Sequence, residues 1–567
     1  MWRFLRLLLA LILSQIVIFF LFLALLLGVV ATFSSVPSVQ EESVLWVQLQ
    51  GEIVEYPTLP RVPFLRRRPL SQSAILEALD MAERDDRMTA VVLDIDYPRI
   101  GWGKASELHE AILGFRQSGK PVFAYAPFLD EISLFVATAC DSIFLPPTGK
   151  IYMDGIGIGP MYFKGTFDKL GVRPNFARTG EYKDAPETSL RRDMSPESRE
   201  QWSWLLDGIW VEFLETLSTS RNIGRADLEE ALNLGLLQPH QAVDLGLIDG
   251  VRYREALLGE LVEDANDPRL VPLMGYHQGM EARAPRRGDA IAVVHTRGLI
   301  LRGRNSYNPY VGTILGAASV VRDLEAATAD DDVVAVVLRI DSPGGEIIAS
   351  DIISNAVERV QTRKPVVVSM VDVAASGGYM MSFRANRIVA LPTTITGSIG
   401  AYTGKLNLRG LYGKIGVTRD FVTRGSFPFL FSDYHDWSAE EESLIVSRQR
   451  EDYDRWISGI AANRNLTPET VDRLGGGRVW TGLQALEHGL VDALGGQELA
   501  IEVAKDVAGL AEDARPRIVH YPEERGFMDL LLEEGDLLWA SLVESWAGSW
   551  APPRDASWGV LNFDLLR

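Results

Sequence analysis

Residues 90–96 read Ala-Val-Val-Leu-Asp-Ile-Asp, and residues 335–341 read Ala-Val-Val-Leu-Arg-Ile-Asp, so the same heptapeptide recurs with one change. Aliphatic, β-branched runs of this length are typical of buried parallel strands. Three more pairs of segments match in the same order, at separations of 243 to 247 residues: 42–51 with 289–298, 170–176 with 415–421, and 242–249 with 485–492. Four ordered matches at a nearly constant separation indicate an internal duplication.

Each copy is expected to be an α/β unit. Short β-branched runs at 333–340 and 366–371 alternate with amphipathic stretches at 317–327 and 347–361, which predicts βαβ crossovers. We therefore expect five segments: a stub and membrane anchor at 1–40, a first repeat at 41–263, a linker at 264–288, a second repeat at 289–511 and a tail at 512–567. The tail carries four tryptophans, which predict either a membrane or subunit contact or packing on the body.

Residues 7–33 form an almost uninterrupted apolar stretch of 27 residues. A membrane-spanning helix needs about 20 apolar residues, whereas the apolar part of a cleavable signal peptide has only about 7–15. The stretch therefore predicts an uncleaved single-pass anchor, with a long signal peptide as the alternative. Arg3 and Arg6 precede it, and no Lys or Arg follows before Arg61. The positive-inside rule then predicts a cytoplasmic N-terminus and a body on the outer, periplasmic face of a bacterial inner membrane.

Composition excludes several classes of function. The chain has 56 Lys and Arg against 76 Asp and Glu, a formal net charge of −20, which disfavours binding to nucleic acid. Its one cysteine, Cys140, cannot form an intrachain disulfide or a Cys-rich metal site. None of the seven histidines lies in a zinc-helix or triad setting, and no phosphate-binding loop is present. We expect no metal and no cofactor.

The second copy carries a candidate nucleophile, Ser376, in Val-Ala-Ala-Ser-Gly-Gly-Tyr at 373–379, just past a predicted strand. Small neighbours let a substrate backbone approach, and the start of a helix favours developing negative charge. Upstream, residues 341–345 read Asp-Ser-Pro-Gly-Gly after another strand. Glycine there allows backbone N–H groups to point at a carbonyl oxygen, and one such donor contributes about 2.7–4 kcal/mol to a transition state.

A lysine of the first copy is the candidate base. Lys183 lies in Gly-Glu-Tyr-Lys-Asp-Ala-Pro at 180–186, and alignment of the copies places it opposite Pro428. The same alignment places Ser376 opposite Asp130, so each copy keeps one half of a Ser–Lys pair. Burial can lower the pKa of a lysine by several units from about 10.4, which would make it a base near neutrality.

Two further residues bear on this assignment. Asp184 follows the lysine and would raise its pKa if the carboxylate faced the ammonium, so we expect Asp184 to point away. Lys405, close after Thr-Gly-Ser-Ile-Gly at 396–400, is the rival base on sequence proximity. The sequence leaves open whether Lys183 meets Ser376 within one chain or across two.

Four motifs, Ser-Pro-Gly-Gly at 342–345, Ala-Ala-Ser-Gly-Gly-Tyr at 374–379, Thr-Gly-Ser-Ile-Gly at 396–400 and Gly-Glu-Tyr-Lys-Asp-Ala at 180–185, resemble the signal peptide peptidase A family. The resemblance, to its long, duplicated, membrane-anchored form, covers about residues 42–510 and the anchor. It implies tandem Clp-protease/crotonase-like domains and a Ser/Lys-dyad serine endopeptidase that degrades remnant signal peptides at the inner membrane.

The resemblance also implies roles for individual residues. Ser376 would be the nucleophile, Lys183 the general base, and Ser398 the residue that orients the lysine. Gly345 and Gly377 would offer oxyanion N–H groups, and Gly344 would shape the turn. The partners implied are apolar, signal-peptide-like peptides, the membrane through the N-terminal helix, and further copies of the chain in a ring-like homo-oligomer.

Two other functions are compatible with parts of the sequence. A crotonase-type acyl-CoA lyase or thioesterase would use the oxyanion glycines, but it explains neither the Ser–Lys complementarity nor the anchor. A catalytically inactive membrane scaffold of the same fold would leave every phenotype unchanged in a Ser376→Ala variant. The complementary loss in the two copies favours the peptidase.

Overall fold

The structure is a computed structural model that describes residues 14–15, 39–57, 70–264, 266–283 and 287–523. None of the helices within these residues combines the length and the apolar composition that a membrane span requires. The expected anchor at 7–33 lies almost wholly outside the described residues, as do the four tryptophans of the tail.

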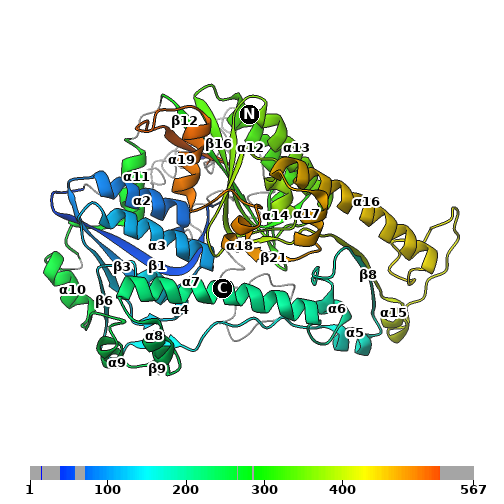
Figure 1. The fold of residues 1–567 in the computed structure, drawn as a ribbon, viewed down its shortest axis with the longest axis horizontal. Helices are drawn as coiled ribbons and strands as arrows, with labels where there is room; N and C mark the ends of the chain where they lie inside the picture. Colours follow the sequence, from blue (N-terminus) through cyan, green and yellow to red (C-terminus); the bar gives the residue numbers. More distant parts are fainter. Residues whose placement is uncertain (1–13, 16–38, 58–69, 265, 284–286, 524–567) are drawn as a thin grey trace, which may run out of the picture.

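The first repeat is built on a seven-stranded, parallel sheet with the order β10-β6-β4-β3-β1-β11, and β2 pairs with β1 (Figure 1). Its strands are β1 (Ser43–Val54), β2 (Leu70–Ser71), β3 (Met88–Arg99), β4 (Val122–Tyr125), β6 (Ser142–Leu145), β10 (Gly250–Val251) and β11 (Leu270–Pro272). The first copy of the heptapeptide lies within β3, where it pairs with β1 and is almost entirely buried.

The second repeat is built on an eight-stranded sheet with the order β21-β19-β17-β16-β12-β23, and β18 pairs with β17 and β22. Its strands are β12 (Ala290–Arg297), β16 (Val333–Ser342), β17 (Val366–Ala375), β18 (Arg387–Ala390), β19 (Ile395–Gly397), β21 (Val479–Thr481), β22 (Ala493–Leu494) and β23 (Arg517–Tyr521). The second heptapeptide lies within β16, and Ile291 of β12 pairs with Ala335 as Val44 of β1 pairs with Ala90. The expected parallel α/β architecture is present in both copies.

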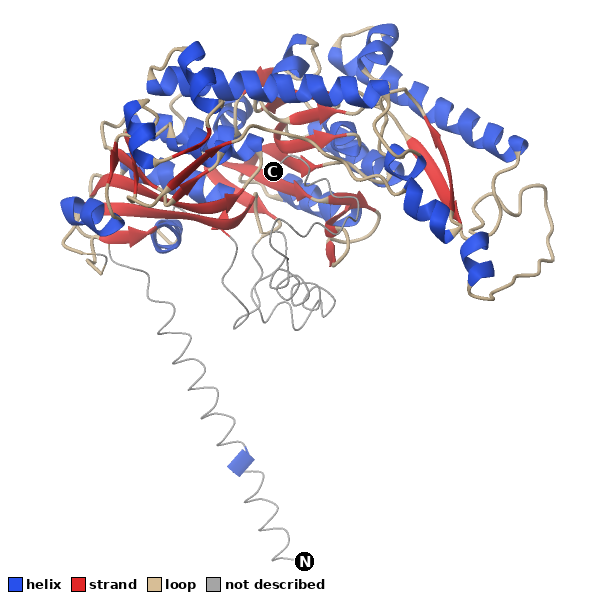
Figure 2. Cartoon of the chain, turned by 90° about the horizontal axis from the view of Figure 1, so that it is seen from below, coloured by secondary structure: helices blue, strands red, loops and turns tan. Residues whose placement is uncertain are grey.

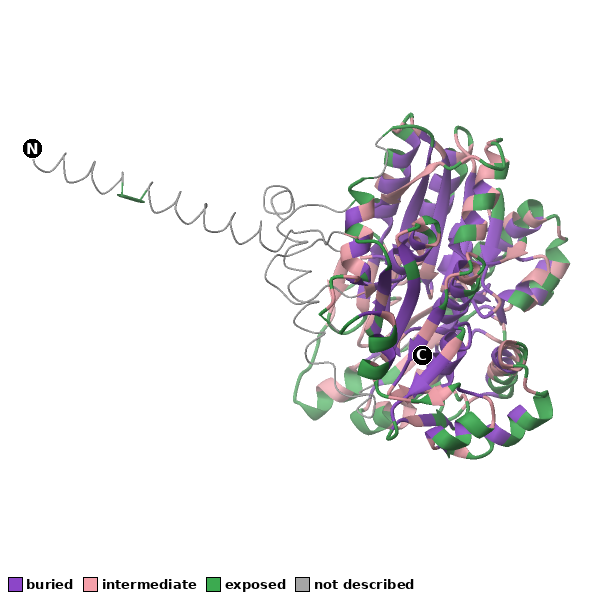
Figure 3. Ribbon diagram, turned by 90° about the vertical axis from the view of Figure 1, so that its left-hand side faces the viewer, coloured by how far each residue is buried: buried purple, intermediate pink, exposed green. Residues whose placement is uncertain are grey.

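Helices cover both sheets, and the strands between them form the buried cores (Figures 2 and 3). In the first repeat the helices that matter for the site are α2 (Gln72–Arg84), α3 (Trp102–Arg116), α4 (Glu131–Ala137) and α7 (Pro196–Arg221). Their counterparts in the second repeat are α12 (Ala317–Ala329), α13 (Ile347–Gln361), α14 (Gly377–Ser382) and α16 (Ala439–Arg464).

The boundaries of the repeats differ from those expected. The stretch expected to be a linker contains β11 and α11 (Leu273–Glu281), and the start of the expected tail contains β23. β11 pairs with β1 and β23 pairs with β12, both in parallel, so each repeat ends on an edge strand of its own sheet. These short strands have no periodic apolar pattern in the sequence. They are stabilised by pairing with a neighbouring strand, which local sequence does not record. The polar, Pro- and Arg-rich composition around β11 had indicated a linker between the repeats.

The two repeats are joined by elements that cross between them. β8 (Arg173–Arg178) of the first repeat pairs antiparallel with β20 (Tyr402–Asn407) of the second. α7 runs along both repeats (Figure 1), and its Trp204 meets Trp480 of β21 edge-on, with ring centroids 4.5 Å apart. Side chains from the two repeats can therefore meet at one site within a single chain.

Candidate active site

Ser376 lies at the turn between β17 and α14, in a backbone conformation that few side chains adopt. Its φ is 54° and its ψ is −114°, and its N–H donates to the Gly397 carbonyl at 2.9 Å. Strain of this kind costs about 1–3 kcal/mol and is concentrated at functional sites. Behind the serine, a Cβ on Gly378 would lie 2.9 Å from the Ser342 carbonyl oxygen, so small residues let this turn sit on the neighbouring loop.

Lys183 reaches this serine from the first repeat. Its Nζ lies 2.9 Å from the Ser376 Oγ, 2.9 Å from the Ser398 Oγ and 2.9 Å from the Ser398 carbonyl oxygen. The lysine is only 5% exposed, whereas Ser376 is partly open to solvent. Of the two arrangements the sequence left open, the structure holds the pair together within one chain.

Burial sets the charge of this amine. Desolvation lowers the pKa of Lys183 to about 7, and the carboxylate of Asp184 acts in the opposite direction. Asp184 is turned towards α7, where its Oδ2 accepts hydrogen bonds from the Ser198 hydroxyl and the Trp202 indole N–H, each at 2.8 Å. Burial therefore favours the neutral form of the Lys183 amine, which is the form able to accept a proton.

The lysine segment lies close against Gly476 and Gly477 of the second repeat, a contact that the sequence motifs did not predict. The Tyr182 N–H donates to the Gly476 carbonyl at 3.0 Å. A Cβ on Gly477 would clash with the backbone of Lys183, and a Cβ on Gly180, whose φ is +94°, would clash with the backbone of Gly476. Only glycine fits at both points. The run of three glycines at 475–477 is the one signal in the sequence for this backbone contact.

The two glycine segments expected near the serine do lie beside it. The Gly344 carbonyl accepts from the Ile300 N–H at 2.9 Å, which ties the loop to β13 (Leu299–Leu301). A Cβ on Gly344 would lie 2.6 Å from the Gly377 nitrogen, and a Cβ on Gly377 would lie 3.1 Å from the Gly345 nitrogen. Within the described part of the chain, neither the Gly345 N–H nor the Gly377 N–H has a protein acceptor. Two backbone donors next to the serine thus have no protein acceptor within the described residues.

The first repeat lacks this machinery at the matching positions. Asp130 precedes α4 as Ser376 precedes α14, and its carboxylate accepts from the Ser133 N–H at 2.9 Å, so it caps the helix. The positions that match Gly344 and Gly345 are held by Arg99 and Ile100. The first repeat thus has neither the serine nor the two glycines at these positions.

Other candidate groups lie elsewhere. The rival base, Lys405, donates from its Nζ to the Phe429 carbonyl at 2.7 Å. Cys140 is buried, and burial raises the pKa of its thiol. No cluster of three or more His, Cys, Asp or Glu suited to a metal ion occurs among the described residues. Ser376 and Lys183 instead pair a hydroxyl at 2.9 Å with a buried amine whose pKa is lowered to about 7.

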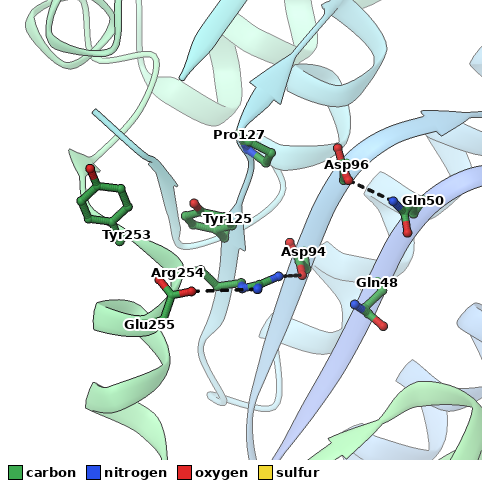
Figure 4. Close-up of a pocket in the computed structure, with 9 residues that line it drawn as sticks. All are labelled: Gln48, Gln50, Asp94, Asp96, Tyr125, Pro127, Tyr253, Arg254 and Glu255. Atoms are coloured by element: carbon green, nitrogen blue, oxygen red, sulfur yellow. Dashed lines mark hydrogen bonds and ion pairs between the residues drawn. The ribbon is translucent and has the colours of Figure 1, made fainter. Parts of the chain in front are cut away.

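A pocket of about 380 Å³ in the first repeat contains none of the expected site residues (Figure 4). Its polar groups pair with one another: Arg254 with Asp94 at 3.1 Å, and Gln50 with Asp96 at 3.0 Å. The remaining lining residues are Gln48, Tyr125, Pro127, Tyr253 and Glu255. This pocket is separate from the serine and the lysine.

A serine hydroxyl in contact with a buried amine, beside two backbone N–H groups without a protein acceptor, is an arrangement typical of serine hydrolases. Comparison with known proteins identifies the family within this class of enzymes. The chain belongs to peptidase family S49, whose family model matches residues 114–266 and 358–511, once in each repeat. It is a serine peptidase.

The chain is 31% identical to the chloroplastic serine protease SPPA of Arabidopsis thaliana, over 85% of this chain and 71% of that protein. It is also 31% identical to Protease 4 of Salmonella typhi, over 86% of this chain and 82% of that protein. Among solved structures, a ClpP1 mutant from Listeria monocytogenes matches 37% of this chain and 94% of its own, with 16% identity and a TM-score of 0.25.

Proposed function

We propose that the protein is an endopeptidase in which Ser376 is the nucleophile and Lys183 the general base. The observation that carries this proposal is the 2.9 Å separation between the Ser376 Oγ and the Nζ of a lysine that is 5% exposed. Buried lysines and strained serines both cost stability, so an inactive scaffold would gain nothing by keeping the two together.

The reaction follows from the positions of these groups. Neutral Lys183 accepts the Ser376 proton as the Oγ attacks a peptide carbonyl. The N–H groups of Gly345 and Gly377 donate to the oxyanion, while Gly344 keeps the loop close to Gly377. The lysine next protonates the leaving amine and activates the water that hydrolyses the acyl-enzyme.

Ser398 orients the lysine in this scheme. Its hydroxyl and its carbonyl each lie 2.9 Å from the Lys183 Nζ. Its φ of 50° is unusual for a residue other than glycine, and its N–H donates to the Arg478 carbonyl at 2.7 Å. Ser398 therefore presents two oxygens to one amine and fixes its direction.

The proposed substrates are apolar, signal-peptide-like segments at the outer face of the bacterial inner membrane. The apolar stretch at 7–33 supports this proposal, because an anchor there would hold the body at the bilayer surface. Within the tandem α/β repeats, the Clp-protease/crotonase-like fold is the one that the resemblance of the motifs suggests.

We expect the activity to depend on pH through one group. Protonated Lys183 cannot accept the serine proton, so kcat/KM for a Leu-rich fluorogenic peptide should rise about tenfold per pH unit below the midpoint and level off above it. The midpoint should lie near pH 7, because burial lowers the pKa of Lys183 to about 7. The Lys405→Met variant should keep this midpoint. A midpoint near pH 10 in the wild-type protein would contradict the assignment.

We also propose that copies of the chain associate head to tail. Each repeat has an exposed surface whose counterpart in the other repeat is covered by a contact within the chain. Within the chain, Trp204 of α7 covers Trp480 of β21. The counterpart of β21 is β9 (Gly235–Leu237), which pairs with β7 (Lys150–Met153). There Leu236 and Tyr152 are 44% and 39% exposed.

The helix of the second repeat that corresponds to α7 also has an exposed face. α16 is the counterpart of α7, and it projects away from the body (Figure 1), with Val446 47% exposed. α16 of one copy can therefore lie on β7 and β9 of the next. An interface that repeats in one direction generates a ring when the rotation closes.

Sedimentation velocity on the detergent-solubilised protein tests this association. The double variant Tyr152→Glu and Leu236→Arg should sediment as a monomer where the wild type sediments as a larger species. Tyr310→Glu, at a site that is 76% exposed in the second repeat, should leave the wild-type species unchanged. A monomeric wild type, or an undiminished oligomer in the double variant, would refute head-to-tail association.

A further inference from the structure

Lys104 is a buried lysine of the first repeat that contacts two carboxylates of the second. It lies in the first turn of α3 and is 3% exposed. Its Nζ donates to the Asp341 Oδ2 at 2.7 Å and also to the Asp372 Oδ2, and its backbone N–H donates to the Asp372 Oδ1 at 2.8 Å. One side chain thus links both carboxylates across the boundary between the repeats.

Both carboxylates border the segments that carry the oxyanion N–H groups. Asp341 immediately precedes the loop at 342–345, and Asp372 lies in β17, four residues before Ser376. The two strands lose their register between them: Ile340 pairs with Met370, but Ser342 pairs with Ala374. One residue of β16 therefore faces three of β17. Irregularities of this kind re-aim side chains beside active sites, and here they turn both carboxylates towards Lys104.

The fit of α3 against this irregularity is tight. A Cβ on Gly103 would lie 2.6 Å from the Val371 carbonyl oxygen, and a Cβ on Gly101 would clash with the Asp372 carboxylate. Burial alone would lower the pKa of Lys104, but the carboxylates of Asp341 and Asp372 outweigh it and leave the pKa raised. This lysine therefore remains charged and cannot serve as a base.

We propose that Lys104 is a positioning residue that fixes the spacing of the Gly345 and Gly377 N–H groups. This inference rests on the proposed function, because it assigns those two groups to the oxyanion. Without the cation, Asp341 and Asp372 would repel each other at short range in a poorly solvated space. The ends of β16 and β17 would separate, and the two donors would no longer converge on one oxygen.

The test is the rate at which a fluorophosphonate probe, which reacts with activated serines, modifies the full-length protein across pH. We expect Lys104→Met to lower the plateau rate about 10- to 100-fold, the size of effect that misplacement by about 1 Å produces. The pH midpoint should stay near that of the wild type, because Lys183 is untouched. Lys120→Met is the matched control: its amine donates to the carbonyls of Ala82, Glu83 and Asp85, within the first repeat. It should label at the wild-type rate.

A second variant distinguishes the loss of the positioning role of Lys104 from the loss of packing by its side chain. In the double variant Lys104→Met with Asp372→Asn, the new side-chain amide can donate to Asp341. Its oxygen can still accept from the backbone N–H of residue 104. We expect this double variant to label at least threefold faster than the single one. If Lys104→Met has no cooperative unfolding transition, a folded double variant within about threefold of the wild type supports the proposal, and one more than tenfold slower overturns it.

The remaining outcomes are decisive. Wild-type labelling of Lys104→Met, a shifted pH midpoint, or a double variant no faster than the single one would overturn the positioning role. Failure of the wild-type protein to label at Ser376 would instead overturn the proposed function, so the two failures are distinguishable.

Discussion

Lys183→Met is expected to lower kcat/KM for peptide hydrolysis by about 10³- to 10⁴-fold, because it removes the group that accepts the Ser376 proton. Methionine has nearly the same length and suits a buried site, so the fold should persist. The variant should unfold at the same denaturant concentration as the wild type or at a higher one, because burying the lysine already costs free energy.

Two comparisons make this result specific. Lys405→Met should keep full activity, because its amine lies at the Phe429 carbonyl and not at the serine. The double variant Lys183→Met with Ser376→Ala should be no less active than either single variant, since residues that act as a unit are not additive. Activity within tenfold of the wild type in Lys183→Met would mean that another group is the base.

Arg339→Met is expected to have the largest effect on stability. Its guanidinium is fully buried between the repeats, where its Nε lies 2.7 Å from Glu55 and its Nη2 also pairs with Glu107. Removing one member of a buried ion cluster costs about 3–5 kcal/mol, because the remaining charges are left unpaired in a low-dielectric interior. Urea unfolding followed by tryptophan fluorescence measures the change.

An exposed ion pair supplies the control. Arg359 and Glu325 lie 3.1 Å apart, with side chains that are 57% and 58% exposed. Arg359→Met should change the free energy of unfolding by less than about 1 kcal/mol. Neutralising both partners as well, with Glu55→Gln and Glu107→Gln, should recover part of the stability lost in Arg339→Met. Equal, small effects of Arg339→Met and Arg359→Met would show that the cluster does not hold the repeats together.

The fold was predictable where a buried strand leaves a continuous aliphatic record in the sequence. The heptapeptide at 90–96 and 335–341 predicted β3 and β16, because strands covered on both faces need apolar residues throughout. β11 and β23 left no such record, because each is a short edge strand held by pairing with β1 or β12. Their positions depend on a partner that local composition does not encode.

The serine and the lysine were predictable because duplication supplies an internal comparison: Ser376 faces Asp130 in the alignment, and Lys183 faces Pro428. The residues that bring them together were not. Gly180 and Gly477 act by lacking a side chain at a close approach of two backbones. Lys104 acts through contacts with Asp341 and Asp372, which lie 237 and 268 positions away in the sequence. Only the three-dimensional arrangement identifies such contacts.

If a lysine of one repeat activates a serine of the other, covalent modification of Ser376 must depend on Lys183. The wild type and Lys183→Met are treated with a fluorophosphonate at pH 8, digested, and analysed by peptide mass spectrometry. We expect an adduct on Ser376 in the wild type and about 10³-fold slower modification of that serine in the variant. Equal modification of Ser376 in both proteins, or an adduct on a different serine, would contradict it.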